Sequence, residues 1–384
     1  MKERSTKRKR GFSLLEMTIA MALGTVVLGA AVQLYSQGVS ATWVVSQRAE
    51  MQQDFRAASN MLVTDLSLAG AGLGDNSQVA LVKAAKSPAY GCDQTKCYIN
   101  AVAQPYPKQG ATPYLYGLVP GYQIGPTLNA AQGATDVVSV VYTDPNFFIN
   151  CYTAKVTSGT VVLFQLPSPL PTTCVLPASL TAPQALNDSV FGLTAGDVIL
   201  FTLTTGGTTT QIVTEVTAAP VVTSPGSGYS AAYNVTFANN DALLLNQSPA
   251  TSGTLGNVAV NTLGSGTRIL ITSYYIDNAV SPPRLMRQVS GHTPMPVAEN
   301  VVYLQFTYDS FANGTVYVDS GDANATENGL TPNQITKINI KHMAMDSTIK
   351  SGLSGSAKGF QSMDLQTSVS GRDLTYRNGF PIGP

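Results

Sequence analysis

The first 40 residues, MKERSTKRKRGFSLLEMTIAMALGTVVLGAAVQLYSQGVS, join a basic start to a long apolar run. Residues 1–11 carry six Lys or Arg and one Glu, whereas residues 17–47 contain no charged side chain over 31 positions. Residues 12–35 are apolar enough to cross a bilayer, with a length of about 36 Å as a helix. Because basic residues flanking a membrane helix stay on the cytoplasmic side, the sequence predicts residues 1–11 inside and the remaining chain outside.

Glu16 interrupts this apolar run. A carboxylate in hydrocarbon costs about 3 kcal/mol or more, so an acid at this depth is a candidate functional residue whose counter-charge must be found. A secretory signal peptide is the competing interpretation, with Gly29–Ala31 (GAA) as a small-residue cleavage site. Signal peptides rarely carry such an acid, and the helical pattern here continues beyond the apolar run.

That continuation predicts one helix over residues 12–69, about 87 Å long. Its second half is amphipathic, with apolar residues recurring at helical spacing. These residues are Val44, Met51, Phe55, Ala58, Leu62 and Leu66. Gly70, Gly72 and Gly74 then supply the stop.

The motif KRKRGFSLLEM (residues 7–17) resembles the class III signal of type IV pilins and type II secretion pseudopilins. The resemblance implies that a prepilin peptidase cleaves between Gly11 and Phe12 and methylates the new amine of Phe12. Glu16 would then be the fifth mature residue, and the Phe12 ammonium group of a neighbouring subunit would be its counter-charge, so that pairing sets the axial register. The alternative is that Glu16 pairs with its own amine one turn away.

The remaining chain, residues 75–384, has no second apolar span and is predicted to be rich in β-strands. Strands are expected at residues 135–144, in a hairpin over 196–216 that turns at Gly206 and Gly207, and at residues 267–278 with a return strand at RLMRQVS. Two further strands are expected at VVYLQFTYDSF and at residues 335–346. In the first, Val302, Leu304, Phe306 and Tyr308 should be packed, and Tyr303, Gln305 and Thr307 should be wet.

The order of these strands is similar to that of the PilW family of minor pilins, and more loosely to the minor pseudopilin J of type II secretion, over essentially the full length. This predicts an α+β, pilin-like fold in which a long N-terminal helix packs on an antiparallel sheet. The expected segments are a cleaved leader (1–11), an assembly helix (12–36), its amphipathic second half (37–74) and a head (75–384). Residues 75–130 and 219–265, rich in Gly, Pro, Ser and Thr, are expected to be long loop insertions.

The four cysteines fall into two local pairs. An exported head with an even count favours two disulfides, most simply Cys92 with Cys97 and Cys151 with Cys174, although four cysteines allow three connectivities. The C-x4-C spacing lacks the second pair or nearby histidine that a zinc site needs.

The acidic loop VDSGDANATENG offers oxygen ligands for calcium through Asp319, Asp322, Asn324 and Glu327. Its spacing differs from an EF-hand, and such loops commonly serve as turns. No cofactor is expected. Beyond residue 11, 16 basic residues stand against 21 acidic ones, which disfavours nucleic-acid binding. The two histidines lie in no recognised nucleophile-and-base motif, so no enzymatic activity is expected.

The resemblance therefore implies a minor pilin, held in the inner membrane with its head in the periplasm and later incorporated into or priming the tip of a type IV pilus. Expected partners are other minor pilins, the major pilin, the prepilin peptidase, the assembly platform and a tip adhesin. A J-like pseudopilin and an adhesive, ligand-binding pilin are the alternatives.

Overall fold

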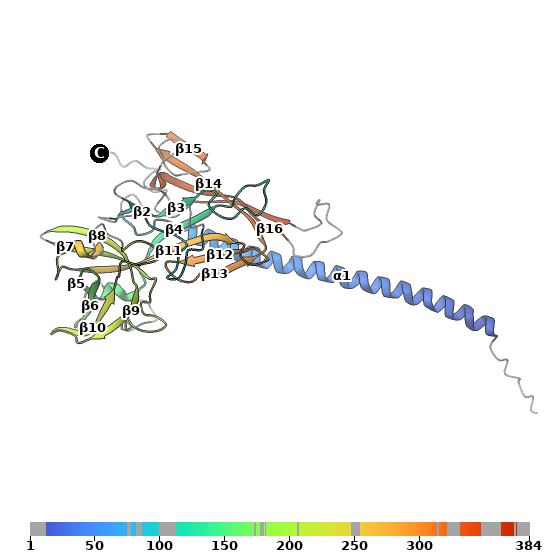
Figure 1. The fold of residues 1–384 in the computed structure, drawn as a ribbon, viewed down its shortest axis with the longest axis horizontal. Helices are drawn as coiled ribbons and strands as arrows, with labels where there is room; N and C mark the ends of the chain where they lie inside the picture. Colours follow the sequence, from blue (N-terminus) through green and yellow to red (C-terminus); the bar gives the residue numbers. More distant parts are fainter. Residues whose placement is uncertain are drawn as a thin grey trace, which may run out of the picture. The chain divides into compact units, whose positions relative to one another are not determined.

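A computed structural model places a long helix and an antiparallel β-rich head in this chain (Figure 1). It describes residues 13–74, 78–81, 87–99, 113–172, 174–176, 180, 182–205, 207–246, 254–312, 315–320, 331–346, 362–371 and 374. The chain forms two compact units, and the division between them falls after Gln53, inside the helix. The architecture is α+β and pilin-like, as predicted.

The elements in chain order are α1 (Leu14–Ser67), β1 (Gln78–Ala80), β2 (Tyr114–Tyr116), β3 (Leu118–Gly121), β4 (Val137–Asp144), η2 (Phe148–Cys151), β5 (Thr153–Ser158), β6 (Val161–Pro167), β7 (Val198–Thr205), β8 (Thr208–Glu215), β9 (Ala218–Thr223), β10 (Tyr229–Thr236), η3 (Thr254–Asn257), β11 (Leu263–Asp277), β12 (Arg284–Val289), β13 (Met295–Glu299), β14 (Val301–Ala312), β15 (Thr315–Ser320), η4 (Pro332–Gln334), β16 (Ile335–Asp346) and β17 (Ser362–Val369).

Helix α1 runs for 54 residues without a proline, because its first half is apolar throughout and its second half keeps an apolar stripe. Most of the predicted stripe is buried, namely Met51, Phe55, Ala58, Leu62 and Leu66. Val44, from the same stripe, is only half-buried. The helix ends two residues earlier than predicted, and Gly70, Gly72 and Gly74 follow with φ of 78°, 75° and 83°. Such left-handed backbone favours glycine and stops a helix.

Strand β11 is the central strand of an 11-stranded sheet. Its first residues pair with β5 and β7, and its later residues pair with β4 and β12, all antiparallel. The predicted hairpins are confirmed, because Thr205 pairs with Thr208 across the β7–β8 turn and Asp277 pairs with Arg284 across the β11–β12 turn. β11 begins at Leu263, four residues before the predicted start.

A separate four-stranded sheet has the order β15–β14–β16–β17. Strand β16 has the predicted bounds, with Ile338 and Ile340 buried between half-buried neighbours. On β14, Leu304, Phe306 and Tyr308 are buried as predicted, whereas Val302 is only half-buried.

The predicted wet face of β14 is wrong in part. Tyr303 and Thr307 are only 8% and 7% exposed. The register of β14 against β16 shifts between Val301 and Tyr303 and again between Gln305 and Phe306, which interrupts simple alternation. Tyr303 also donates its hydroxyl to the carbonyl oxygen of Gln132, a partner that the strand sequence does not reveal.

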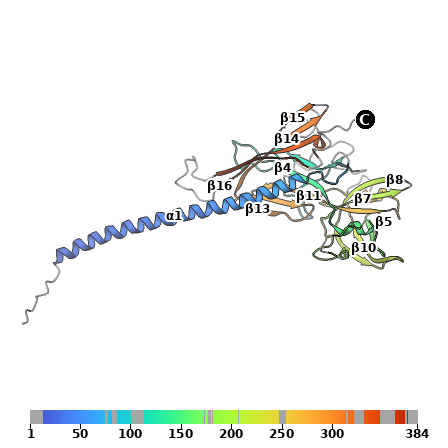
Figure 2. The ribbon, with the colours of Figure 1, turned by 180° about the vertical axis from the view of Figure 1, so that it is seen from behind.

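Both segments expected to be loop insertions contain strands. Residues 75–130 include the short strands β1, β2 and β3, and residues 219–265 include β10 and most of β9. Strands β9 and β10 extend the large sheet in the order β6–β10–β9 and lie near β5 and β7 at one end of the head (Figures 1 and 2). Tyr233 and Val235 of β10 are buried in a core with Phe164 and Phe201. The sequence pattern did not predict these strands, because the surrounding segment is rich in Ser and Thr. The apolar residues that β10 packs against also come from distant parts of the chain.

Candidate functional site

The first turn of α1 places Glu16 at the helix N-terminus. The backbone N–H of Ser13 donates to Glu16 Oε2 at 3.0 Å, and the N–H of Met17 donates to the Ser13 carbonyl at 3.1 Å. A carboxylate that accepts an amide hydrogen here satisfies one of the free N–H groups at a helix start. Gly11 and Phe12, the expected cleavage and methylation positions, lie outside the described residues.

The apolar half of α1 is suited by length and composition to cross a membrane. Its most apolar 18-residue window has a mean hydropathy of 1.9 and is not buried within this chain. The hydroxyls of Thr18 and Thr25 donate to the carbonyls of Leu15 and Ala22, at 2.9 and 2.8 Å. These polar side chains are thus satisfied within the helix, as a hydrocarbon environment requires.

The C-terminal turns of α1 are anchored in the head through Asp65. Tyr274 on β11 donates its hydroxyl to Asp65 Oδ2 at 2.6 Å, and Arg287 Nε on β12 donates to the same oxygen at 2.7 Å. Burial, followed by the charge of Asp65, raises the pKa of Tyr274 above its usual value. Burial alone would lower the pKa of Arg287, but its bond to Asp65 raises that pKa instead. Removing Asp65 would therefore leave a half-buried cation without its partner.

The sequence pattern does not reveal this anchor. The only signal was an acid, Asp65, beside Leu66 in the buried stripe, and its partners lie more than 200 residues away.

The glycine turn after α1 is joined to β4. Gly70 donates its N–H to the Val141 carbonyl, and Thr143 donates its N–H to the Ala71 carbonyl, both at 2.9 Å. A Cβ atom at Gly72 would collide with the Thr143 side chain. The turn thus needs glycine for its backbone conformation and for this close approach.

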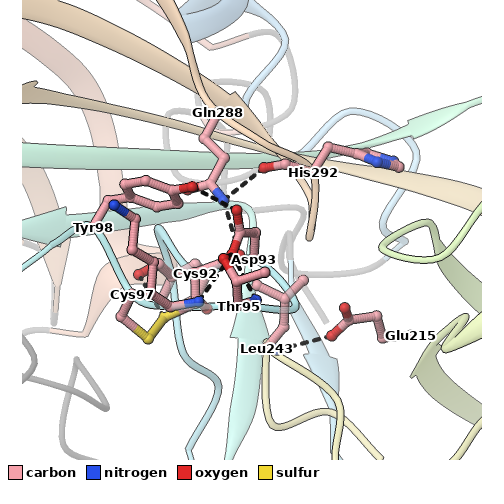
Figure 3. Close-up of a disulfide and its surroundings, with 11 residues drawn as sticks. Cys92, Asp93, Thr95, Cys97, Tyr98, Glu215, Leu243, Gln288 and His292 are labelled. Atoms are coloured by element: carbon pink, nitrogen blue, oxygen red, sulfur yellow. Dashed lines mark hydrogen bonds between the residues drawn. A yellow bond between two sulfur atoms is a disulfide. The ribbon is translucent and has the colours of Figure 1, made fainter.

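The structure joins Cys92 to Cys97 and Cys151 to Cys174, the two pairs that are closest in sequence. The first disulfide closes a loop that Gln288 holds in place, because its Nε2 donates to the carbonyls of Cys92 and His292, both at 2.8 Å (Figure 3).

Inside this loop, Asp93 accepts hydrogen bonds from Thr95, Lys96 and Tyr98. Burial would raise the pKa of Asp93, but these bonds outweigh it and lower the pKa to about 2.

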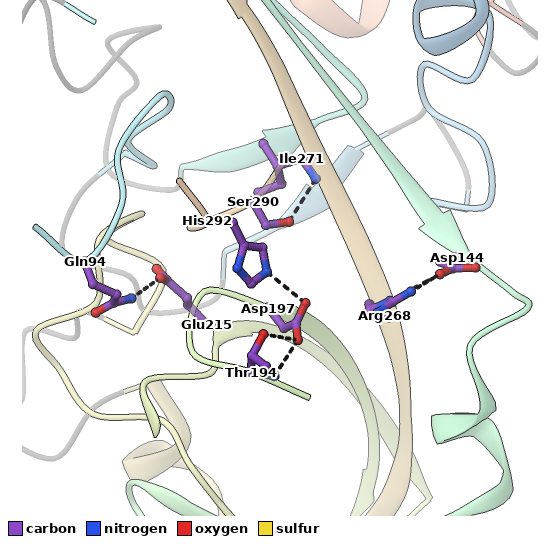
Figure 4. A network of polar contacts seen from close by, with 9 residues as sticks. All are labelled: Gln94, Asp144, Thr194, Asp197, Glu215, Arg268, Ile271, Ser290 and His292. Carbon is purple, nitrogen blue, oxygen red and sulfur yellow. Dashed lines mark hydrogen bonds and ion pairs between the residues drawn. The ribbon is translucent and has the colours of Figure 1, made fainter. Parts of the chain in front are cut away.

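A buried acidic pair, Glu215 and Asp241, lies beside the same loop. Gln94 Nε2 donates to Glu215 Oε1 at 2.6 Å, and the N–H of Leu243 donates to Glu215 Oε2 at 2.8 Å (Figures 3 and 4). Burial raises the pKa of Glu215 to about 8, and the charge of Asp241 contributes further. At neutral pH this carboxyl therefore holds a proton, so that the buried pair avoids carrying two negative charges.

Each histidine contacts a carboxylate. His292 Nε2 lies 3.2 Å from Asp197 Oδ1, and Thr194 donates its N–H to the other oxygen of Asp197 (Figure 4). His342 Nδ1 lies 2.7 Å from Asp364 Oδ2 at the surface. The first contact joins the residue before β7 to the turn after β12, and the second joins the neighbouring strands β16 and β17.

The predicted calcium loop is largely outside the described residues, which exclude Asp322, Asn324 and Glu327. Asp319 ends up on strand β15, and its side chain is also outside the described part. Among the residues that the structure describes, no group of three or more His, Cys, Asp or Glu side chains could hold a metal ion. The calcium prediction remains a prediction.

A protein family described as "Prokaryotic N-terminal methylation motif" matches residues 6–32. The matched stretch contains Gly11, Phe12 and Glu16 together with most of the apolar half of α1. No curated protein and no solved structure matches the chain. The motif supports a type IV pilin-like protein that is anchored in a membrane by α1 and has a structural role.

Proposed function

We propose that this protein is a minor pilin of the PilW type that primes or caps a type IV pilus. The observation that carries the proposal is the methylation motif at residues 6–32, continuous with a helix whose first half exposes apolar side chains on every side. An isolated chain cannot bury these side chains, so lipid before assembly and neighbouring pilin helices after assembly are the surroundings that suit them.

In the proposed mechanism, the prepilin peptidase cleaves between Gly11 and Phe12 and methylates the Phe12 amine. The carboxylate of Glu16 then pairs with the Phe12 ammonium group of a neighbouring subunit. Either charge alone is costly in hydrocarbon, so pairing selects the stagger between subunits. The Ser13–Glu16 hydrogen bond keeps the Glu16 carboxylate at the start of its own chain, so pairing with its own amine is the competing geometry.

Before assembly, the same helix anchors the protein in the inner membrane with the head in the periplasm, in keeping with the six basic residues that precede it. The partners in this proposal are other minor pilins, the major pilin, the prepilin peptidase, the assembly platform and a tip adhesin. Catalysis is not part of the proposed role.

Deletion of the gene tests the proposal when sheared surface pili and secreted exoproteins are measured in the same cultures. We expect loss of pili with normal secretion, restored by a plasmid copy of the gene. Normal pili with exoproteins trapped in the periplasm would overturn the pilus assignment in favour of a J-like pseudopilin. Normal piliation with lost surface attachment would instead favour an adhesive pilin.

A further inference from the structure

A small pocket of about 260 Å³ lies in the head where three segments meet. One wall is Tyr98 and Ile99, which follow the disulfide loop, and another is the turn 124–126. The base includes Val137 at the start of β4, and the end of β11 contributes Tyr275 and Asp277. A volume of this size suits a single side chain or a similarly small ligand.

Hydrogen bonds fix each wall separately. Tyr98 donates its N–H to the Gly91 carbonyl at 2.8 Å and its hydroxyl to Asp93 at 2.6 Å. The N–H of Gly125 donates to the Thr135 carbonyl at 2.9 Å. At the rim, the N–H of Ala279 donates to Asp277 Oδ1 at 2.9 Å. A ligand would therefore meet a preformed pocket and lose little affinity to ordering it.

Asp277 of the lining has spare bonding capacity. Its Oδ1 accepts one bond from the N–H of Ala279, and no ion pair involves it among the described residues. The hydroxyl of Tyr275 is enclosed by the protein and is not available to a ligand in the pocket. A ligand that supplies hydrogen-bond donors would therefore bind at the carboxylate of Asp277.

The charges around the pocket favour a cation. Asp93 and Asp277 are its acidic neighbours. Of the basic side chains, the ammonium group of Lys96 lies over the Tyr98 ring at 4.6 Å. Arg284, which pairs with Asp277 in the β11–β12 register, directs one terminal nitrogen to Glu299 at 3.0 Å, and its buried Nε has no hydrogen-bond partner in the described part of the chain. The apolar side chains of Ile99, Ile124 and Val137 would contact an aliphatic stem.

We propose that this pocket binds an alkylammonium or alkylguanidinium group, with the aliphatic stem against the isoleucines and the cation at Asp277. The group could be supplied by a lysine or arginine side chain of a partner protein or by a free small amine. This inference does not depend on which filament the protein serves.

The test is calorimetric titration of the full chain in detergent with N-acetyl-lysine methylamide and with its uncharged counterpart, N-acetyl-norleucine methylamide. We expect the lysine compound to bind about tenfold or more tightly than the norleucine compound. Asp277→Asn should weaken lysine binding by about tenfold while keeping the bond to Ala279. Ile124→Trp should abolish binding by filling the pocket. Asp188→Asn is the control and should leave binding unchanged, because Asp188 also accepts a backbone N–H from two residues on but is not in the pocket lining.

Equal binding of the two compounds, or unchanged lysine binding in Asp277→Asn with a normal melting temperature, would overturn the proposal. A parallel titration with n-butylamine separates the two sources. Tighter binding of the blocked lysine indicates a partner side chain, whereas tighter binding of n-butylamine indicates a free amine.

Discussion

At the scale of single residues, two acids in unfavourable surroundings carry the strongest consequences. Glu16 lies in an apolar run, and among the described residues its carboxylate accepts a hydrogen bond from the backbone of Ser13 alone. Glu215 is fully buried and is stabilised by a retained proton and by neighbouring donors. An unpaired charge is costly in both surroundings. A neutral substitution should therefore change filament incorporation at Glu16 and the pH dependence of stability at Glu215.

Glu16→Ala should leave cleavage and methylation intact, because both act at Phe12, and should reduce incorporation into filaments by about tenfold or more. Mass spectrometry of the mature N-terminus and immunoblots of sheared filaments provide the two measurements. Glu50→Ala, the same change later in α1, is the control and should incorporate normally. Normal incorporation of Glu16→Ala would mean that another contact sets the register.

Glu215 should make stability depend on pH. Its folded-state pKa of about 8 lies above its value in an unfolded chain, so the folded state binds an extra proton between these values. The free energy of unfolding should therefore fall as pH rises from about 4.5 to about 8, by a few kcal/mol at most.

Urea unfolding of the full chain at pH 5, 7 and 9 checks this expectation. Glu215→Gln mimics the protonated acid and should lose much of the pH dependence, whereas Glu299→Gln, at an exposed ion pair, should retain it. Asp93 does not contribute to the change in unfolding free energy between pH 5 and 9, because its lowered pKa of about 2 affects stability only in stronger acid. Identical pH profiles for wild type and Glu215→Gln would contradict the retained proton.

At the scale of elements, the junction between α1 and the sheet depends on the glycine turn and on Asp65. The turn bonds to β4 on both sides, and Asp65 bonds to β11 and β12. The end of the helix is therefore fixed to three strands by polar contacts in addition to its buried apolar stripe.

Gly72→Ala and Gly74→Ala form a matched pair that tests this junction. Both positions have positive φ, but only at Gly72 would the added Cβ collide with a neighbouring side chain. We expect Gly74→Ala to cost about 1 kcal/mol of unfolding free energy, and Gly72→Ala about 2–4 kcal/mol. Equal losses in chemical unfolding would show that the approach to Thr143 relaxes without cost.

At the scale of the whole molecule, the two disulfides close loops of different length in the head. The sequence separations are 5 residues for Cys92–Cys97 and 23 for Cys151–Cys174. Closing the longer loop removes more freedom from the unfolded chain, so the chain-entropy relation gives about 2 kcal/mol for the first and about 3 kcal/mol for the second.

The double variants Cys92→Ala/Cys97→Ala and Cys151→Ala/Cys174→Ala should therefore both unfold at lower urea concentration, the second more than the first. Membrane insertion, scored by fractionation, should be unchanged in both, because α1 directs it. A larger loss from the Cys92–Cys97 pair would indicate that its loop, which holds Gln94 and Tyr98, contributes more through packing than through entropy.

The sequence alone determined the features that depend on local order. The basic residues 1–11, the apolar run that contains Glu16, the glycine stop and the β7–β8 and β11–β12 hairpins all arise from residues close together in the chain. The methylation motif is of the same kind, which is why residues 6–32 could be matched without any knowledge of the head.

Only the tertiary structure decided which distant groups meet. Asp65 with Arg287, Glu215 with Gln94 and the three-walled pocket at Tyr275 join segments separated by tens to hundreds of residues. Strands β9 and β10 were likewise missed, because their apolar faces are defined by what they cover. Local propensity can indicate that a residue is buried or polar, but the free energy of a buried charge or hydroxyl depends on partners that folding alone brings into contact.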